Sequence, residues 1–257
     1  MPTFGYKGFK YADGRLCCRD QTYEIGVPVK LTEPRGPMIC KRGFHYCSDL
    51  ADVLDHYIPS PDHVYGRVEN LAPDEYNIFE DKSCTGHIVL HELLNGPVLC
   101  RDGTVMYFKD GKIHNSEGPA IITSRAVNLQ FTRLDRFWNG NGTTETEYRM
   151  WFNEGAMSSI NDEPSFRGTS GITAWFRNNL LHRIGGPAVI WADGTQEWFR
   201  DDHPHRDGDM PAVIYPSGTL EWWVDGKLHR DGGPARVFPS GCKDYFTHGV
   251  FQRIESK

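Results

Sequence analysis

Three His-Arg pairs recur along the C-terminal part of the chain and offer its clearest chemistry. In order they are His182-Arg183, His205-Arg206 and His229-Arg230. Successive histidines lie 23 and 24 residues apart, so each unit of a repeated segment contributes one pair. A row of arginines along one edge of a sheet would suit an anion, because a guanidinium group binds carboxylate or phosphate through two parallel hydrogen bonds.

The histidines of these pairs permit two other roles. A stack of imidazoles could ligate a metal ion, as histidine nitrogen does for zinc. An imidazole at the end of a strand can also hydrogen-bond the backbone of the following turn. We expect this backbone role and no bound metal, with the arginine-lined anion site as the alternative.

Two adjacent aromatic residues precede each His-Arg pair, as in Trp198-Phe199. Because neighbours on a strand point to opposite faces, alternation predicts two aromatic rows. One row contains Trp175, Trp198 and Trp222, and the other contains Phe176, Phe199 and Trp223. One of them can form a core. The other must be covered by a curled sheet, the N-terminal domain or a second copy, or else must bind a partner, because large exposed apolar patches mark interaction sites.

The elements that position these residues are short hairpins. The tripeptide Gly-Pro-Ala recurs, for example at Gly186-Pro187-Ala188, and either it or the close variant Met210-Pro211-Ala212 follows each histidine. Within one unit, a strand ending at Trp191 is followed by the turn Ala192-Asp193-Gly194 and a second strand, Thr195–Arg200. Two strands and two turns in about 23 residues predict a meandering antiparallel sheet over residues 90–257. The pattern dissolves at about residues 121–148, where we expect a degenerate or inserted unit.

The segment Trp222–Gly233 resembles the core of a MORN repeat, with an aromatic residue, then Gly-Lys-x-His, then glycine. The repeats also resemble the Asp-Gly-Pro-Ala repeats of phage and bacterial proteins. These resemblances imply a MORN-like array that works as a non-enzymatic interaction module of phage or prophage type. Its partner would be a host or viral protein. Self-association into a structural assembly is the alternative use of the same array.

Residues 1–89 do not follow the repeat and predict a small α+β domain. Strands are expected at Phe4–Phe9, in two short segments between Thr22 and Leu31, at Gly43–Ser48, at His63–Glu69 and at Ile88–Leu90. Asp49 can cap a helix over Leu50–Tyr57, whose apolar residues recur at three- and four-residue steps. The fold class expected for the whole chain is therefore mainly β, with an α+β domain followed by the hairpin array.

This first domain resembles a domain of unknown function found in phage and mobile-element proteins. The matching segments include Gly5–Phe9, Tyr23–Gly26, Gly43–Cys47 and Asp81–Thr85. It is also similar to ADP-ribosyltransferase-like folds, in which a Tyr-x-Gly strand is followed by a Gly-Phe-aromatic-x-Ser motif and a helix.

That second resemblance implies an enzymatic alternative for the domain. Transferases of this kind hold a nicotinamide cofactor between the first two motifs and use a later glutamate. The matching candidates are Tyr6, His45 and Glu69, with Ser48 in the second motif and Glu92 as the other possible glutamate. Lys7 stands where arginine or histidine is usual, which weakens the match. We therefore commit to no catalytic residue and to no cofactor.

Cysteines and a histidine in the same domain raise one further alternative, a zinc site. Cys17, Cys18, Cys40, His45 and Cys47 supply enough nitrogen and sulfur ligands for tetrahedral coordination. No Cys-x-x-Cys pair is present, so the spacing matches no common zinc knuckle. Buried thiols beside a core histidine are the expected state.

Composition sets limits on the partners. The net charge of −6 provides no basic surface for nucleic acid. No run of about 18 apolar residues is present to span a membrane, and no signal peptide opens the sequence. The odd count of seven cysteines argues against a secreted disulfide framework. We expect a cytoplasmic protein with a protein partner, or one that associates with itself.

Overall fold

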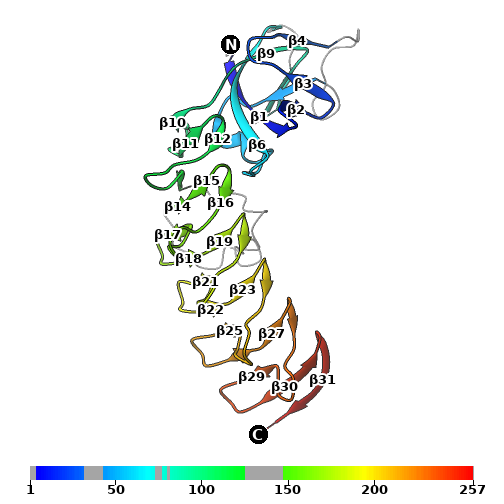
Figure 1. Cartoon of the computed structure of the whole chain (residues 1–257), viewed down its shortest axis with the longest axis vertical. Coiled ribbons are helices and arrows are strands. Elements are labelled where there is room, and N and C mark those ends of the chain that lie inside the picture. The colour runs from blue at the N-terminus through cyan, green and yellow to red at the C-terminus, as the bar shows by residue number, and fades with distance from the viewer. Residues whose placement is uncertain (1–3, 32–42, 73–76, 80–81, 125–146, 257) are drawn as a thin grey trace. The chain divides into compact units, whose positions relative to one another are not determined.

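The computed structural model describes residues 4–31, 43–72, 77–79, 82–124 and 147–256 (Figure 1). The chain is mainly β, as expected, and α1 (Leu50–Val53) is the one α-helix among these residues. No helix in the described part is long and apolar enough to cross a membrane. The chain divides into two compact units, Met1–Asn128 with Phe152–Ala156, and Leu129–Trp151 with Met157–Lys257.

The N-terminal sheet is near-barrel in form, with strand order β3-β2-β1-β6-β9-β4. Its strands are β1 (Phe4–Ala12), β2 (Arg15–Cys18), β3 (Gln21–Tyr23), β4 (Val29–Lys30), β6 (His63–Asn70) and β9 (His87–Leu93). Phe9, Val68, Ile88 and Leu90 are fully buried and form its core. A separate three-stranded sheet contains β5 (Phe44–Tyr46), β7 (Asn77–Phe79) and β8 (Lys82–Thr85). The strands predicted for this region are present.

The helix of this domain is shorter than predicted. Asp49 caps it as expected, because its side chain accepts a hydrogen bond from the N–H of Ala51. The prediction of a helix reaching Tyr57 is wrong, since α1 ends after one turn at Val53. Beyond that point the N–H of Asp55 and that of His56 donate to carbonyls three residues back, which is the pattern of tighter turns. The domain therefore has almost no helix.

The repeats form an antiparallel sheet in which fourteen strands are described. They are β10 (Gly96–Leu99), β11 (Val105–Lys109), β12 (Lys112–Ile113), β13 (Ile121–Thr123), β14 (Tyr148–Met150), β17 (Phe166–Gly168), β18 (Thr173–Ala174), β21 (Val189–Ile190), β22 (Gln196–Glu197), β25 (Val213–Ile214), β26 (Leu220–Glu221), β29 (Arg236–Val237), β30 (Lys243–Thr247) and β31 (Val250–Glu255). Most of the degenerate unit expected at 121–148 lies outside the described residues.

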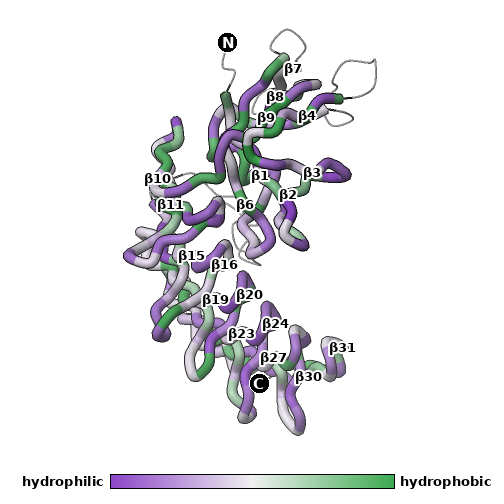
Figure 2. The backbone as a smooth tube through the Cα atoms, turned by 45° about the horizontal axis from the view of Figure 1, so that its top comes forward, coloured by the Kyte–Doolittle hydropathy of each residue, from purple (hydrophilic) through white to green (hydrophobic). Residues whose placement is uncertain are grey.

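Four of the described repeats also contribute a separate two-stranded hairpin. These hairpins pair β15 (Phe152–Asn153) with β16 (Ala156–Met157), β19 (Phe176–Arg177) with β20 (Leu180–Leu181), β23 (Phe199–Arg200) with β24 (His203–Pro204), and β27 (Trp223–Val224) with β28 (Lys227–Leu228). In Figure 1, β19, β23 and β27 form a column beside the main-sheet strands β21, β25 and β29. Figure 2 shows that the hairpin ends near β20 and β24 are hydrophilic.

The separate hairpins arise because the backbone changes its pairing partner at the first aromatic residue of each repeat. The N–H of Trp198 donates to Ala212 in the main sheet, while its carbonyl accepts from the N–H of His205 in its own hairpin. Trp175 and Trp222 make the equivalent bonds. The single strand predicted at Thr195–Arg200 is therefore wrong. Two short strands, β22 and β23, are joined there at Trp198.

The interior of the array explains why alanine follows each Gly-Pro. Ala188, Ala212 and Ala235 are fully buried. In the main sheet, the register pairs Val189 with Glu197 and Glu197 with Val213, so one row of inward-facing residues mixes aliphatic and acidic side chains. A larger side chain at the alanine positions would overpack this interior.

Candidate functional site

The three transferase candidates of the N-terminal domain are not assembled into one site. The register of β1 and β6 sets Tyr6 opposite Arg67. The carboxylate of Glu69 is hydrogen-bonded to His91, with 2.7 Å between Glu69 Oε2 and His91 Nε2. His45 lines a hollow of about 620 Å³, but neither Tyr6 nor Glu69 does. Glu92, the other possible glutamate, lies 3.9 Å from Arg67. The three side chains therefore do not line one common hollow, although backbone hydrogen bonds of 2.7 and 2.9 Å pair Tyr6 with Cys47, two residues after His45.

Lys7, which the sequence showed only as a departure from the transferase pattern, also lines that hollow. Lys7 is 2% exposed, and its Nζ donates to the carbonyl of His45 at 2.8 Å. The rings of Phe9, Tyr23 and Tyr57 lie 5.8–5.9 Å from Nζ. Burial lowers the pKa of Lys7. Its place in an alternating strand, between inward-facing residues, was the available sign of burial.

His45 is also shifted toward its neutral form. Burial, followed by the nearby charge of Lys7, lowers the pKa of His45 to about 4. Cys18 Sγ lies 2.7 Å from the hydroxyl of Tyr57 at the same hollow. This arrangement is a packed polar cluster beside aromatic rings.

The zinc hypothesis concerns the same part of the chain. Cys40 lies outside the described residues, so the full predicted ligand set cannot be placed. Cys17 and Cys18 are neighbours at the end of β2, and Cys47 is buried. Within the described ranges, no group of three or more histidine, cysteine or acidic side chains is arranged to hold a metal ion.

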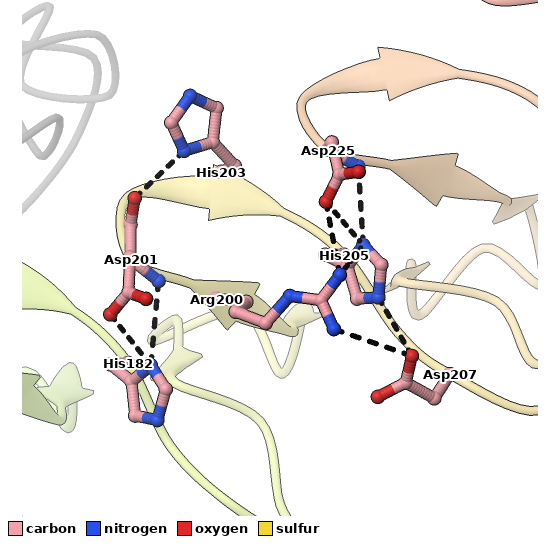
Figure 3. Close-up of polar contacts among 7 residues, drawn as sticks. All are labelled: His182, Arg200, Asp201, His203, His205, Asp207 and Asp225. Atoms are coloured by element: carbon pink, nitrogen blue, oxygen red, sulfur yellow. Dashed lines mark hydrogen bonds and ion pairs between the residues drawn. The ribbon is translucent and has the colours of Figure 1, made fainter.

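In the repeat array, the histidines hydrogen-bond the next turn, as expected. The N–H of Asp201 donates to His182 Nδ1 at 3.4 Å, and that of Asp225 donates to His205 Nδ1 at 3.2 Å (Figure 3). The N–H of His248 donates to His229 Nδ1 at 3.3 Å. Each imidazole therefore satisfies a backbone donor of the following unit and couples successive repeats.

A second set of arginines, not predicted from the sequence, also links neighbouring units. Arg200 Nη2 lies 3.0 Å from Asp225 Oδ1, and His205 sits between Asp207 and Asp225 (Figure 3). In the preceding unit, Arg177 Nη2 lies 2.6 Å from Asp201 Oδ1. Hydrogen bonds from these arginines lower the pKa of both Asp201 and Asp225. Both arginines immediately follow an aromatic pair, Trp175-Phe176 and Trp198-Phe199, and this was the sign that could have revealed them.

Both aromatic rows are largely covered by the chain itself. Trp175, Trp222, Phe176 and Phe199 are buried, while Trp198 and Trp223 are half-buried. Of the alternatives that the sequence left open for the second row, the structure shows cover by the chain's own residues. The bend at each tryptophan folds the hairpin over the aromatic side chains. A continuous flat strand would have left one of the two aromatic rows exposed to solvent.

The arginines of the His-Arg pairs complete this cover by stacking on the tryptophans. The guanidinium carbon lies 3.8 Å from the ring centroid for Arg183 on Trp175 and for Arg206 on Trp198. For Arg230 on Trp222 the distance is 4.0 Å. Such contacts combine cation–π attraction with packing. The predicted arginine row exists, but its members lie on indole rings and do not form an open edge of cations.

Two hollows lie between successive His-Arg loops. The first, of about 260 Å³, is lined by both His182-Arg183 and His205-Arg206. The second, of about 430 Å³, lies between His205-Arg206 and His229-Arg230. Ile184 lines the first hollow and is 84% exposed, and Met210 lines both and is 46% exposed.

Comparison with known families bears on the first domain. Residues 4–101 match the family described as Domain of unknown function (DUF7666). A search of curated proteins found no match to the chain. The protein therefore consists of an N-terminal DUF7666 domain followed by a long antiparallel β-sheet of short hairpins.

Proposed function

We propose that this chain is a non-enzymatic interaction module whose repeat array binds another protein. We further propose that the repeats are MORN-like and that the chain is a cytoplasmic accessory protein of phage or prophage type. The Gly-Lys-x-His core and the Asp-Gly-Pro-Ala likeness support this part of the proposal. The transferase alternative has less support, because Tyr6 and Glu69 do not line the hollow that contains His45.

The observation that carries the proposal is the recurrence of hollows at the period of the repeat. Two successive gaps between His-Arg loops are each open, and aliphatic side chains stand exposed beside charged ones at their rims. A turn that contacts only solvent would be expected to carry polar residues at the exposed positions of Ile184 and Met210. A partner segment with side chains at regular spacing could contact both hollows at once, with apolar anchors and a polar rim.

The test is capture of partners from a host-cell lysate by the full-length protein, followed by binding measurements with each captured protein after purification. We expect the double variant Ile184→Asp, Met210→Asp to lose the proteins that the wild type retains. Ile160→Asp is the matched control, because Ile160 is an exposed isoleucine in the corresponding loop of an earlier unit. Equal retention by the wild type and the double variant would contradict the proposal.

A specific observation also favours self-association as a second candidate function. Strand β31 is an edge of the main sheet among the described strands, and its Val250, Phe251 and Ile254 are all exposed. An unpaired edge with apolar side chains can pair with another chain. Sedimentation should then show concentration-dependent oligomers that Gln252→Pro disrupts. A monomer at all concentrations would exclude this candidate.

A further inference from the structure

The loops that follow the His position alternate in length over the four units between Ser158 and Pro234. Ser158–Pro164 and His205–Pro211 are each one residue longer than His182–Pro187 and His229–Pro234. Two residues before the proline, the longer loops carry Asp162 and Asp209, whereas the shorter loops carry Gly185 and Gly232. This part of the array therefore has two kinds of loop that follow one another in turn.

In the longer loops, a single aspartate satisfies two donors of the next unit. Asp162 receives Arg183 through both carboxylate oxygens, at 2.8 and 2.7 Å, and its carbonyl accepts from Trp175 Nε1 at 2.8 Å. Asp209 repeats the arrangement with Arg230, at 2.7 and 2.9 Å, and with the indole of Trp222, at 3.0 Å. One residue thus offers a carboxylate to the guanidinium and a backbone carbonyl to the indole N–H.

The unit between these two lacks that aspartate, because Gly185 occupies the corresponding position. Arg206 still stacks on Trp198, and its Nη1 donates to the carbonyl of Pro211 at 3.0 Å. Among the described residues, however, no carboxylate pairs with Arg206 and no acceptor meets the indole N–H of Trp198. Trp198 is correspondingly more exposed than Trp175 and Trp222.

Among the described residues, the partly buried guanidinium of Arg206 also has no carboxylate to compensate its charge. Burial lowers the pKa of Arg206, and no neighbouring carboxylate opposes that effect. By contrast, the hydrogen bonds from Arg183 and Arg230 lower the pKa of Asp162 and Asp209. Arg206 is therefore a partly desolvated cation whose electrostatic partner is missing.

The missing aspartate leaves open space. Arg206 and Trp198 line the hollow of about 260 Å³, together with Gly185, Ile184 and Met210. A Cβ built on Gly185 would meet nothing within 4 Å. The volume is several times the roughly 30 Å³ that one water occupies in the liquid, so part of a polypeptide can enter.

We propose that this hollow recognises an acidic residue of a partner polypeptide. The carboxylate of that residue pairs with Arg206, and its backbone carbonyl accepts from Trp198 Nε1. The geometry is that of Asp162 and Asp209 in the neighbouring units, supplied here from outside the chain. Ile184 and Met210 provide apolar contacts for the flanking residues. The inference rests on the proposed function, because it names the side chain by which a protein partner would be bound.

The template within the array distinguishes an acidic residue from a simple anion. Inorganic phosphate can pair with Arg206, but it cannot reproduce the paired carboxylate and carbonyl that Asp162 offers. A blocked amino acid, N-acetyl-aspartate N-methylamide, contains both groups and serves as the probe. N-acetyl-asparagine N-methylamide retains the carbonyl and the shape without the charge.

The experiment is a titration of the full-length ¹⁵N-labelled protein, followed through the indole N–H resonances of its seven tryptophans. Trp198→Phe assigns the relevant signal. We expect blocked aspartate to shift the Trp198 resonance saturably, with a dissociation constant of about 1–10 mM, as for a small charged ligand. The resonances of Trp175 and Trp222 should stay unchanged, because their donors are already bonded.

Arg206→Gln should weaken this binding about tenfold or more, as expected for loss of a charge-assisted pair. Arg230→Gln is the matched control, since Arg230 already has its internal carboxylate, Asp209, and does not line this hollow, and it should leave the titration unchanged. Gly185→Asp places a carboxylate at a left-handed position, like those of Asp162 and Asp209, and should abolish the response. Unchanged dispersion of the other indole signals shows that each variant is folded.

Three outcomes would overturn the inference: no shift of Trp198, an equal shift with blocked asparagine, or an equal response to inorganic phosphate. None of these outcomes depends on the capture of a partner, so the proposed acidic-residue site can be contradicted without contradicting the proposed protein-binding function. Conversely, binding of blocked aspartate without any captured protein would leave the site established and count against the proposed function.

Discussion

Glu197 is a buried residue whose protonation should affect the stability of the array. Its carboxyl is buried in the array, and burial, reinforced by Glu221, raises its pKa from 4.5 to about 7. The folded state therefore holds this proton more tightly than the unfolded chain does. Its ionisation costs nothing below pH 4.5 and destabilises the fold progressively as the pH rises to about 7.

Glu197→Gln should remove this dependence and raise the free energy of unfolding at pH 8 by up to roughly 3 kcal/mol. At pH 4 the variant and the wild type should be close in stability. Urea denaturation at both pH values measures the difference. Glu163→Gln, at an exposed carboxyl, is the control and should show no such gain. A variant less stable than the wild type at pH 8 would show that ionised Glu197 is favourable to the fold.

His45 makes a second prediction at this scale, for the N-terminal domain. His45 is half-buried, and its backbone carbonyl accepts a hydrogen bond from Lys7 Nζ. We expect His45→Ala to lower the free energy of unfolding by about 1–3 kcal/mol, the usual cost of leaving buried groups unsatisfied. Thermal denaturation measures this loss, and calorimetry should detect no binding of a nicotinamide cofactor to the wild type. Cofactor binding that disappears in the variant, with stability unchanged, would support the transferase alternative.

Among the repeat elements, the tryptophans should differ in their contribution to stability. Trp175 and Trp222 are buried, and each indole N–H donates to an aspartate carbonyl. Replacing either with alanine should cost about 3–5 kcal/mol. Trp198→Ala should cost clearly less, because Trp198 is half-buried and lacks the aspartate partner. The denaturation midpoints of the three variants provide the comparison, and equal losses would show that the missing aspartate has no energetic consequence.

The repeated hairpins were predictable because the residues that form their turns act locally. Glycine and proline favour particular backbone angles in any context, so Gly186-Pro187 predicts a turn from the sequence alone. The bend at Trp198 was not predictable, since alternation reads the same whether a strand continues or changes its pairing partner. The role of Asp162 also escaped prediction, because it depends on a loop one residue longer meeting an arginine 21 residues later. Such a contact exists only after units have stacked.

For the repeat array as a whole, successive units depend on one another. The N–H of Asp202 donates to Leu181, that of Gly226 to Pro204 and that of Gly249 to Leu228, so each hairpin is bonded to its neighbour. We expect cleavage at the exposed turn before Leu180 to destabilise both products, as in other stacked arrays. Limited proteolysis with hydrogen exchange tests this. A folded fragment after Leu180, with the remainder unaffected, would contradict a continuous array.

The order of long and short loops also limits how many repeat units this part of the array can lose or gain without disturbing its contacts. From Asp162 to Asp209, and likewise from Trp175 to Trp222, the spacing is 47 residues, which spans one long and one short loop. Loss or duplication of a single unit would set two loops of the same kind side by side. One junction would then either gain an internal carboxylate or lose one. Between Ser158 and Pro234, only the loss or gain of two adjacent units together preserves this order.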